Sequence, residues 1–418
     1  MITVIGLGFV GLTTALGFAH KGFKVFGYDI DRKKVNDIKK GEIPFHEPYL
    51  YEYLRTYADD NFCLCDTLES ALRDSEVIFY CVGTPVGPNG EANVDIIKTA
   101  VRDSLKFIKK DKFKVITIKS TVPPSTAKNV IAECIKQEGF VLGKQIGIVS
   151  NPEFLREGYA WEDFLKPDRI VIGEYDKKSG DVLQEIYKSF GGKTYRVSLN
   201  TAEFMKYLSN SFLANLISFS NEMSMIADKF GDIDVINAFA SLHDDKRWFG
   251  NPAAMTSYAY PGCGFGGYCL PKDVLAIKSA ANDKGCETAM LDSVLNTNNH
   301  VKEFIVQKVV NASKADEKIG IAGLSFKPES DDIRDTPAKQ IIELLIKNDR
   351  RNIIAYDPMA VEIFKNTYKL PIDYADSFEE LSKSCSVILI ATAWPEFKQK
   401  KDLLAGKKII DGRYFLNK

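Results

Sequence analysis

Short apolar runs rich in β-branched residues alternate with longer helix-like stretches in this chain, and this alternation restricts its fold more than any other feature. In the first half, the expected strands cover 2–5, 24–28, 77–82, 114–118, 146–149 and 170–172. Successive strands that are each followed by a helix pair in parallel through right-handed crossovers. The pattern therefore predicts a doubly wound parallel sheet.

A long helical pattern begins at Asn200, where Asn200 and Glu203 form a plausible capping pair. Its apolar stripe comprises Phe204, Leu208, Phe212, Leu216, Phe219, Met223 and Ile226. Strand-like runs return at 318–322, 352–356, 387–391 and 408–411. We therefore expect an α/β protein with two Rossmann-like parallel-sheet domains, over 1–199 and 301–418, joined by a central helical domain over 200–300.

Length and composition restrict the class of protein. The 418 residues exceed the roughly 250–300 at which a single core stops growing. The 55 basic and 56 acidic residues nearly cancel, so nothing favours nucleic-acid or membrane-surface binding. The eight cysteines lack the paired spacing of a zinc site or a disulfide framework, and no apolar run reaches membrane-spanning length. We expect a cytoplasmic protein without a metal site and without a signal peptide.

Gly6, Gly8 and Gly11 follow the first expected strand and open a helical run. Backbone amides and the helix dipole at such a start bind a pyrophosphate. Three glycines at this spacing also occur in ordinary turns. An acidic residue at the end of the next strand is therefore the discriminating observation.

Asp29 ends that next strand. A carboxylate there accepts both ribose hydroxyls of NAD and repels the extra phosphate of NADP. Arg32, Lys33 and Lys34 follow directly; their cations could accommodate that phosphate, or they could form a solvated helix start. NAD is the expected cofactor.

Gly264, Gly266 and Gly267 lead to Cys269, after which Pro271 can begin a helix. Helix N-terminal amides and the neighbouring Lys272 would favour the thiolate, which is the nucleophilic form. A lone cysteine is more often a small buried core residue. The flexible approach and the charged pair after it favour the nucleophile.

Lys206 and Asn210 lie four residues apart on the long helix, roughly opposite its apolar stripe. Together they could bind a developing oxyanion, although such a pair is usually a solvated helix face.

Asn151 and Pro152 resemble the cap and first residue of a helix, which would place Glu153 and Glu157 one turn apart. Two such carboxylates could position water and accept protons; the alternative is an acidic first turn that complements the helix dipole. Thr121 follows a strand, at the edge where ligands bind in open parallel sheets.

In combination, these features resemble the UDP-glucose/GDP-mannose dehydrogenase family, from Met1 into the C-terminal domain. The matching segments are GLGFVGL (6–12), KSTVP (119–123), NPEFLREG (151–158), AEFMKYLSN (202–210), GFGGYCLPKD (264–273) and GLSFKPESDDIRDTP (323–337). Their order and spacing together make the resemblance specific.

The resemblance implies an NAD-binding N-terminal domain, a helical centre that builds a homodimer, and a C-terminal domain that binds the nucleotide half of the substrate. Cys269 would be the nucleophile. Protons and the oxyanion would be handled by Lys206, Asn210 and Asp273, and water would be positioned by Thr121, Glu153 and Glu157. The expected cofactor contacts are Gly6, Gly8, Gly11, Asp29, Lys34, Thr84, Thr121, Glu157, Lys272 and Arg334. The expected substrate contacts are Phe154, Leu155, Lys206, Asn210, Arg247, Tyr258, Phe265, Gly266 and Lys327.

The reaction implied by the resemblance consumes two NAD and one water. One hydride leaves C6 of the sugar to give an aldehyde, which Cys269 captures as a thiohemiacetal. A second hydride transfer gives a thioester, and attack by water releases the uronic acid.

The segment GGYCLPKD is similar to the UDP-glucose and GDP-mannose branches of the family. UDP-glucose is the expected substrate, with GDP-mannose or a UDP-N-acetylhexosamine as the alternative. The segment 247–261 is longer than that of bacterial UDP-glucose enzymes. This length weakens the match of Arg247 to a family arginine that reaches the neighbouring subunit's sugar site.

Two other classes of protein fit part of the pattern. A β-hydroxyacid dehydrogenase also joins a dinucleotide domain to a long helix with lysine and asparagine, but it needs neither Cys269 nor a second α/β domain. A non-catalytic sensor could bind NAD and a nucleotide sugar, but it would need no nucleophile.

Overall fold

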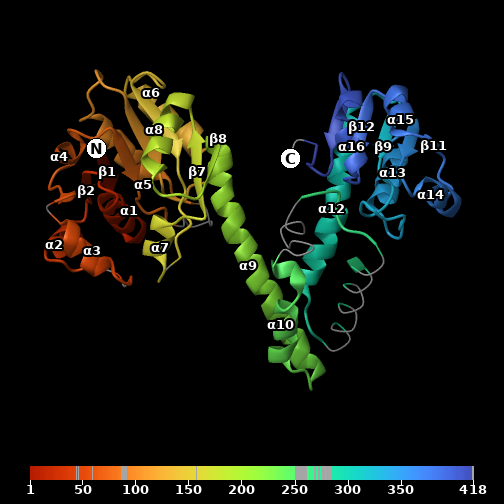
Figure 1. Ribbon diagram of the computed structural model, residues 1–418, viewed down its shortest axis with the longest axis horizontal. Coiled ribbons are helices and arrows are strands. Elements are labelled where there is room, and N and C mark those ends of the chain that lie inside the picture. Colours follow the sequence, from red (N-terminus) through yellow and green to blue (C-terminus); the bar gives the residue numbers. More distant parts are fainter. Residues whose placement is uncertain are drawn as a thin grey trace. The chain divides into compact units, whose positions relative to one another are not determined.

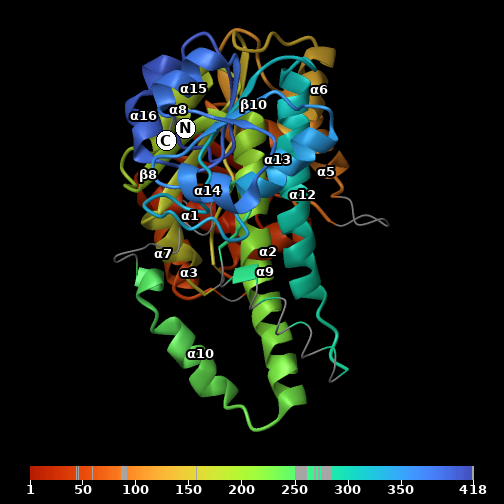
Figure 2. The same ribbon diagram turned by 90° about the vertical axis from the view of Figure 1, so that its right-hand side faces the viewer.

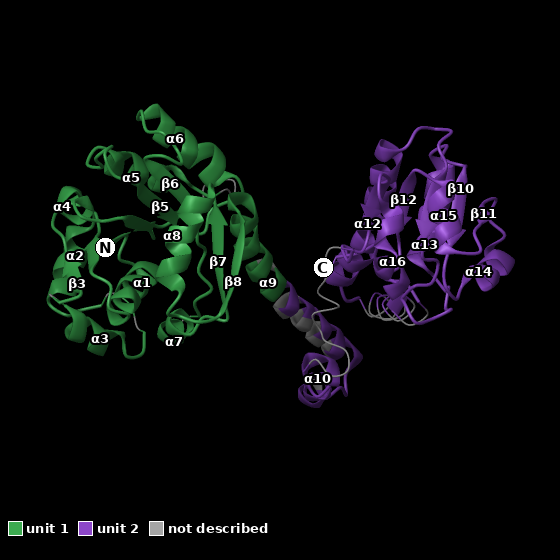
Figure 3. Cartoon of the chain, turned by 45° about the horizontal axis from the view of Figure 1, so that its top comes forward, with its two compact units in different colours: residues 1–214 green, residues 215–418 purple. Residues whose placement is uncertain are grey.

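The computed structural model describes residues 1–43, 45, 47–58, 60–85, 92–156, 158–249, 261–267, 270–271, 274, 278, 282 and 285–416. The chain forms two compact units, Met1–Ala214 and Asn215–Lys418 (Figure 3). The boundary falls inside the long helix α9, Leu199–Phe230. None of the described helices is both long enough and apolar enough to cross a membrane.

An eight-stranded sheet forms the centre of the first unit, in the order β3-β2-β1-β4-β5-β6-β7-β8 (Figure 1). Its strands are β1 (Ile2–Ile5), β2 (Val25–Tyr28), β3 (Phe62–Leu64), β4 (Val77–Tyr80), β5 (Lys114–Ile118), β6 (Ile146–Ser150), β7 (Arg169–Glu174) and β8 (Lys193–Ser198). The inner strands β1, β4, β5 and β6 are buried along their whole length, because both faces of the sheet are covered.

Helices cover the two faces of this sheet as separate groups. The helices of the unit before α9 are α1 (Phe9–His20), α2 (Arg32–Lys39), α3 (Leu50–Tyr57), α4 (Leu68–Leu72), α5 (Asp95–Leu105), the π-helix η1 (Thr126–Ile131), α6 (Ala132–Gln137), α7 (Ala160–Leu165) and α8 (Lys177–Tyr187). One core cluster joins the sheet to α1, α3, α7 and α8, and the other joins it to α5, η1 and α6.

The expected α/β class and the six strands expected in this half are confirmed, with three differences. The strands β3 and β8 were not expected, because β3 has only three residues and β8 is largely polar. The pair β6 and β7 is antiparallel, whereas a fully parallel sheet was expected. Apolar periodicity records burial but not strand direction, so the sequence pattern could not reveal this reversal.

The expected capping pair of the long helix is wrong. The helix begins one residue earlier, at Leu199, and the Ser198 hydroxyl accepts the backbone N–H of Thr201 at 3.2 Å. The Glu203 carboxylate instead accepts the backbone N–H groups of Ser125 at 2.7 Å and Ala127 at 2.8 Å. Glu203 therefore anchors α9 to the start of η1, and its burial raises its pKa to about 7.

The second unit contains a five-stranded, all-parallel sheet in the order β11-β10-β9-β12-β13. Its strands are β9 (Ile319–Ala322), β10 (Ile353–Tyr356), β11 (Asp373–Tyr374), β12 (Val387–Ile390) and β13 (Lys408–Asp411). Four of the five were expected from the sequence; the two-residue β11 was not.

Helices also cover both faces of this sheet. After α9, the described helices are α10 (Val235–His243), the 3-10 turn η2 (Lys246–Phe249), α12 (Ala289–Ala312), α13 (Pro337–Lys347), α14 (Val361–Tyr368), α15 (Phe378–Ser384), α16 (Pro395–Gln399) and the 3-10 turn η4 (Lys401–Leu404). Helices α12 and α13 pack together (Figure 2) and share one core cluster with α14, while α15 and α16 belong to another.

An aromatic cluster in the first unit provides a test of this core. Phe18 of α1 is fully buried, with its ring centroid 5.0 Å from that of Phe79 and 5.3 Å from that of Phe164. We expect Phe18→Ala to lower the free energy of unfolding of this unit by about 3–5 kcal/mol, because a large cavity remains. Denaturant unfolding followed by circular dichroism measures the loss. The matched control is Phe107→Ala, at a ring that is 41% exposed; equal losses for both variants would contradict the packing described.

Candidate active site

The turn between β1 and α1 has the backbone geometry of a phosphate-binding loop. Gly6 has a φ of +89°, a left-handed conformation that glycine adopts without strain. A Cβ at Gly11 would lie 1.7 Å from the carbonyl oxygen of Gly6, so only glycine allows α1 to start so close to β1. Beside Gly8, at the helix N-cap, there is open space. This combination fits a pyrophosphate at the helix N-terminus.

Asp29 lies beside this turn, at the end of β2, and borders the same hollow of about 550 Å³ as Gly6 and Gly8. Its carboxylate accepts the backbone N–H of Leu7 at 2.7 Å and that of Asp31 at 2.9 Å. Lys34 donates to it at 2.8 Å. Burial alone would raise the pKa of Asp29, but these hydrogen bonds and the Lys34 charge lower it. The carboxylate is therefore held ionised and oriented.

The cations after Asp29 have partners on the chain itself. Lys34 pairs with Asp29, whereas Lys33 pairs with Asp37 at 2.9 Å. The Arg32 guanidinium donates to the backbone oxygen of Asp66. Of these three cations, only Lys34 lies on the wall of the hollow.

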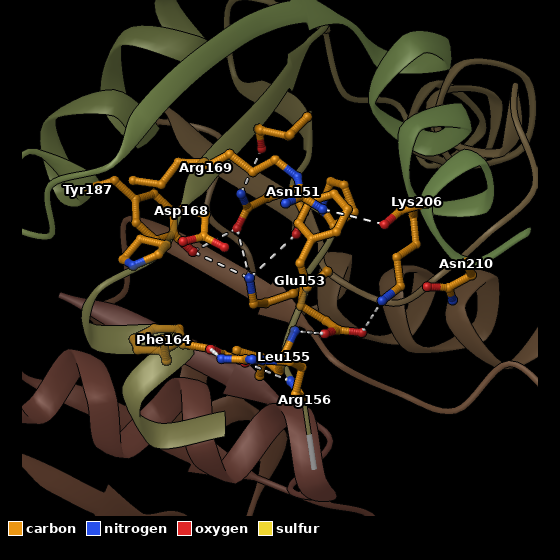
Figure 4. A pocket seen from close by; sticks show the side chains of 18 of the residues that line it. Asn151, Glu153, Leu155, Arg156, Phe164, Asp168, Arg169, Tyr187, Lys206 and Asn210 are labelled. Carbon is orange, nitrogen blue, oxygen red and sulfur yellow. Dashed lines mark hydrogen bonds and ion pairs between the residues drawn. The ribbon is translucent and has the colours of Figure 1, made fainter. Parts of the chain in front are cut away.

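A second hollow, of about 420 Å³, lies in the same unit where β5, β6 and β7 meet α9 (Figure 4). Its walls include the expected residues Glu153, Phe154, Leu155, Lys206 and Asn210, which the structure brings together. Lys206 and Glu153 form an ion pair with 2.9 Å between Nζ and Oε1, and their side chains are only 10% and 12% exposed. Lys206 is therefore not part of a solvated helix face.

The segment 151–156 is not helical, so the expected helix carrying Glu153 and Glu157 is wrong. The Glu153 carboxylate folds back and accepts the backbone N–H of Leu155 at 2.6 Å, which fixes a tight turn instead of a helical start. Helix α7 begins only at Ala160. Glu157 lies outside the described residues.

Glu47 holds the far end of this segment. Its carboxylate accepts the backbone N–H groups of Gly158 and Ala160, each at 2.8 Å, and so caps α7. Arg156 adds an ion pair to Asp163 with 2.7 Å between Nη2 and Oδ1. The irregular segment is thereby tied to regular elements.

Several residues on the walls of this hollow were not among the expected site residues, including Lys119, Arg169 and Tyr187. The Arg169 guanidinium lies 3.9 Å above the ring of Phe154 and fixes that ring from one side. Lys119 directly follows β5, at the same sheet edge as Thr121, and this position could have identified it. Arg169 and Tyr187 come together with it only through the tertiary fold.

Thr84 and Thr121 lie close together near this site. The Thr84 hydroxyl donates to the backbone oxygen of Thr121 at 2.9 Å. Thr121 also borders a small recess that it shares with Glu203 and Lys206. Thr121 and Lys206 thus line the same recess.

In the second unit, the expected glycine loop is closely packed. The backbone N–H of Phe265 donates to Asn298 Oδ1 of α12 at 2.8 Å. A Cβ at Gly266 would lie 2.3 Å from the backbone oxygen of Asp335. The backbone N–H of Gly267 donates to the oxygen of Arg334 at 2.9 Å. Cys269, Lys272 and Asp273, which follow this loop, lie outside the described residues.

Three further expected residues are placed within the second unit. The Lys327 ammonium lies 5.5 Å from the ring centroid of Phe326. The Arg334 guanidinium pairs with Asp332 at 2.7 Å, and that of Arg247 pairs with Asp245. Tyr258 lies outside the described residues.

Three family models match successive parts of the chain, and all belong to the UDP-glucose/GDP-mannose dehydrogenase family. They describe its NAD-binding domain over residues 1–191, its central domain over 200–300 and its UDP-binding domain over 320–418. The cofactor expected from Gly6, Gly8, Gly11 and Asp29 is thereby confirmed as NAD.

Curated relatives and solved structures agree with these models. The chain is 36% identical to UDP-glucose 6-dehydrogenase YwqF of Bacillus subtilis, over 99% of this chain and 93% of that protein. It is similar to a GDP-mannose dehydrogenase from Pseudomonas aeruginosa solved as a ternary complex, with a TM-score of 0.88, 30% identity, and coverage of 100% and 97% of the two chains. It is also similar to a UDP-glucose dehydrogenase from Pyrobaculum islandicum, with a TM-score of 0.57, 34% identity, and coverage of 99% and 94%. The chain belongs to the UDP-glucose/GDP-mannose dehydrogenase family.

Proposed function

We propose that UDP-glucose is the substrate and that its C6 alcohol is oxidised to the carboxylate through a covalent intermediate on Cys269. Family membership makes the chain an NAD-dependent nucleotide-sugar dehydrogenase and removes the β-hydroxyacid dehydrogenase from consideration. The observation that carries the mechanism is the Lys206–Glu153 ion pair on the wall of one hollow, next to Asn210 and Phe154.

Each proposed site residue has a separate role in the two oxidations and the hydrolysis. NAD, held by the turn between β1 and α1 and by Asp29, would supply the hydride acceptor for both oxidations of C6. Lys206 and Asn210 stabilise the developing oxyanion, and Asp273 takes part in proton transfer. The Cys269 thiolate adds to the aldehyde carbon and leaves again when water attacks the thioester. Glu153 and Thr121 position that water, and Glu157 is the second carboxylate for this step.

The remaining contacts are assigned in the same way. Gly6, Gly8 and Gly11 would hold the pyrophosphate of NAD, and Asp29 would accept hydrogen bonds from its ribose hydroxyls, with Lys34 orienting Asp29. The other proposed cofactor contacts are Thr84, Thr121, Glu157, Lys272 and Arg334. The proposed substrate contacts are Phe154, Leu155, Lys206, Asn210, Arg247, Tyr258, Phe265, Gly266 and Lys327.

We further propose three domains, over 1–199, 200–300 and 301–418, and a homodimer formed through the central one. The exposed apolar side chains of α9 support the dimer, since Phe204, Leu208 and Phe212 are 53%, 55% and 43% exposed. The cytoplasm is the proposed compartment, because the cysteines show no disulfide pattern.

GDP-mannose is the second candidate substrate, because the solved structure with a TM-score of 0.88 is a GDP-mannose dehydrogenase. The curated relatives instead favour UDP-glucose. We expect kcat/KM to be roughly 100-fold or more higher for UDP-glucose than for GDP-mannose, because a site built for a pyrimidine rejects the larger purine. Steady-state kinetics with both sugars and their N-acetyl relatives measures the ratio. A preference for GDP-mannose would reassign the substrate and leave the rest of the mechanism intact.

The covalent step predicts the behaviour of a cysteine variant. The wild type should release two NADH per sugar oxidised, and Cys269→Ser should abolish release of the uronate while NAD binding stays within about 2-fold, because hydroxyl is a far weaker nucleophile than thiolate. NADH absorbance, product chromatography and titration with NAD measure these quantities. Cys63→Ser, on the short strand β3, is the matched control. A wild-type ratio near one, or full activity in Cys269→Ser, would refute the covalent mechanism.

Asp29 predicts the cofactor preference. In Asp29→Asn, the KM for NAD should rise roughly 10-fold, the effect of losing about 1.4 kcal/mol from hydrogen bonds to a charged group. The KM for NADP should fall, because Lys34 loses its carboxylate partner and can meet the added phosphate. Initial rates with each cofactor measure both. Lys33→Ala is the control, since Lys33 pairs with Asp37; an unchanged cofactor ratio in Asp29→Asn would contradict the assignment.

A further inference from the structure

One buried cation beside the Lys206–Glu153 pair has no role in the mechanism above. Lys119 is 4% exposed and lies on the wall of the hollow, directly after β5. Its ammonium binds neutral groups, with Nζ 3.1 Å from Asn151 Oδ1 and 3.4 Å from the Tyr187 hydroxyl. A methionine would fill similar space without the cost of burying a charge. The presence of the charge therefore requires an explanation.

Lys119 holds the residue from which the Glu153 segment starts. Besides the side-chain bond, its Nζ lies 3.5 Å from the backbone oxygen of Asn151. The Tyr187 hydroxyl donates to Asn151 Oδ1 at 2.7 Å, and the Asn151 amide donates to the backbone oxygen of Val171 at 2.8 Å. The Asn151 side chain is thus held by the lysine that follows β5, by β7 and by α8 at once. Glu153 follows only two residues later.

The walls of the hollow carry more cationic than anionic side chains. Its walls carry four cationic side chains, Lys119, Arg156, Arg169 and Lys206, and three anionic ones, Glu153, Asp163 and Asp168. Arg156 pairs with Asp163 and Lys206 with Glu153. Lys119 makes no ion pair with any residue that the structure describes, and its charge acts on Glu153 and Lys206 through space. The Lys119 ammonium is thus held by neutral groups, the Asn151 amide oxygen and the Tyr187 hydroxyl.

We propose that Lys119 is a positioning residue for the hydrolytic step: its ammonium holds Asn151, and through Asn151 the segment that presents Glu153 to the attacking water. This inference rests on the proposed function, because it assumes that Glu153 positions that water. Lys119 does not touch the sugar in this scheme. Its loss should therefore slow thioester hydrolysis and spare the two hydride transfers.

Rapid mixing of Lys119→Met with UDP-glucose and NAD tests this assignment. We expect two NADH per subunit to form at close to the wild-type rate, followed by a steady state roughly 10- to 100-fold slower, the cost of misplacing a catalytic group by about 1 Å. The KM for UDP-glucose should change little. The inference is overturned if the burst of NADH disappears, or if only KM changes.

The chain offers a matched control on the same strand. Lys114, at the start of β5, is also a buried lysine, and its Nζ donates to the backbone oxygen of Leu72 at 3.1 Å. Lys114→Met removes a buried ammonium at the opposite end of β5, so its turnover per folded molecule should stay at the wild-type value. Equal losses in the two methionine variants would show that Lys119 is merely structural.

A second variant covers the case in which Lys119→Met does not fold. Tyr187→Phe removes one hydrogen-bond partner of Lys119 and of Asn151, but it keeps the ring that packs on Phe18. This variant should also show a full burst of NADH followed by a slow steady state, with the steady-state rate reduced several-fold. Wild-type turnover in this variant would count against the network.

The pH dependence gives an independent readout. Burial lowers the pKa of Lys119 to about 8, although Cys81 and Glu153 oppose that shift and Lys206 adds to it. Tyr187, whose pKa is raised by burial, stays neutral. The contribution of the Lys119 charge is therefore present below pH 8 and is lost as the pH rises through this value. In Lys119→Arg, kcat should persist to higher pH; superimposable profiles for this variant and wild type would contradict a role for the charge.

Failure of this inference can be distinguished from failure of the proposed function. If the covalent mechanism is wrong, wild type gives one NADH per sugar or Cys269→Ser keeps full activity, and no variant shows a burst of two NADH followed by slow turnover. If only the role of Lys119 is wrong, wild type keeps the ratio of two and Lys119→Met behaves like Lys114→Met.

Discussion

The direction of the strands is the constraint on which the first unit depends. Because β1, β2, β4, β5 and β6 are parallel, their carboxyl ends lie along one edge of the sheet. The residues that follow these ends include Gly6, Asp29, Cys81, Lys119 and Asn151, and each of them borders one of the two hollows. A single topological rule thus brings the glycine turn after β1 and the segment that begins at Asn151 to the same edge.

Ion pairs then orient the charged side chains near this edge of the sheet. Asp29 meets Lys34, Glu153 meets Lys206, and Asp163 meets Arg156. Each carboxylate also accepts a backbone N–H, so the side chains have defined orientations before any ligand binds. Such preorganisation reduces the reorganisation needed when charge develops on a substrate.

Much of the fold followed from local patterns. Continuous apolar runs predict buried strands, and ten strands were expected correctly on this basis. The spacing of the glycines after β1 likewise predicted the cofactor turn. The short strands β3 and β11, the polar β8 and the antiparallel pairing of β7 with β6 have no such local pattern. Helical spacing drew attention to Lys206 and Asn210, the family resemblance gave them a role, and the structure places both on the wall of the hollow.

The segment 151–156 is where the expected secondary structure was wrong. Asn151 and Pro152 have the local chemistry of a helix start, yet tertiary partners use the same groups differently. Asn151 bonds to Lys119, Tyr187 and Val171 rather than capping a helix. No rule based on neighbouring residues can anticipate partners that are 20 to 36 positions away.

The hydrogen bonds at both ends of that segment limit the insertions and deletions that the chain can tolerate there. Surface connections usually tolerate insertions and deletions. Here Asn151 is bound at one end and Gly158 and Ala160 are bound to Glu47 at the other. A residue gained or lost between these anchors would shift the side chains that this stretch presents to the hollow, so the stretch can diverge in composition far more readily than in length.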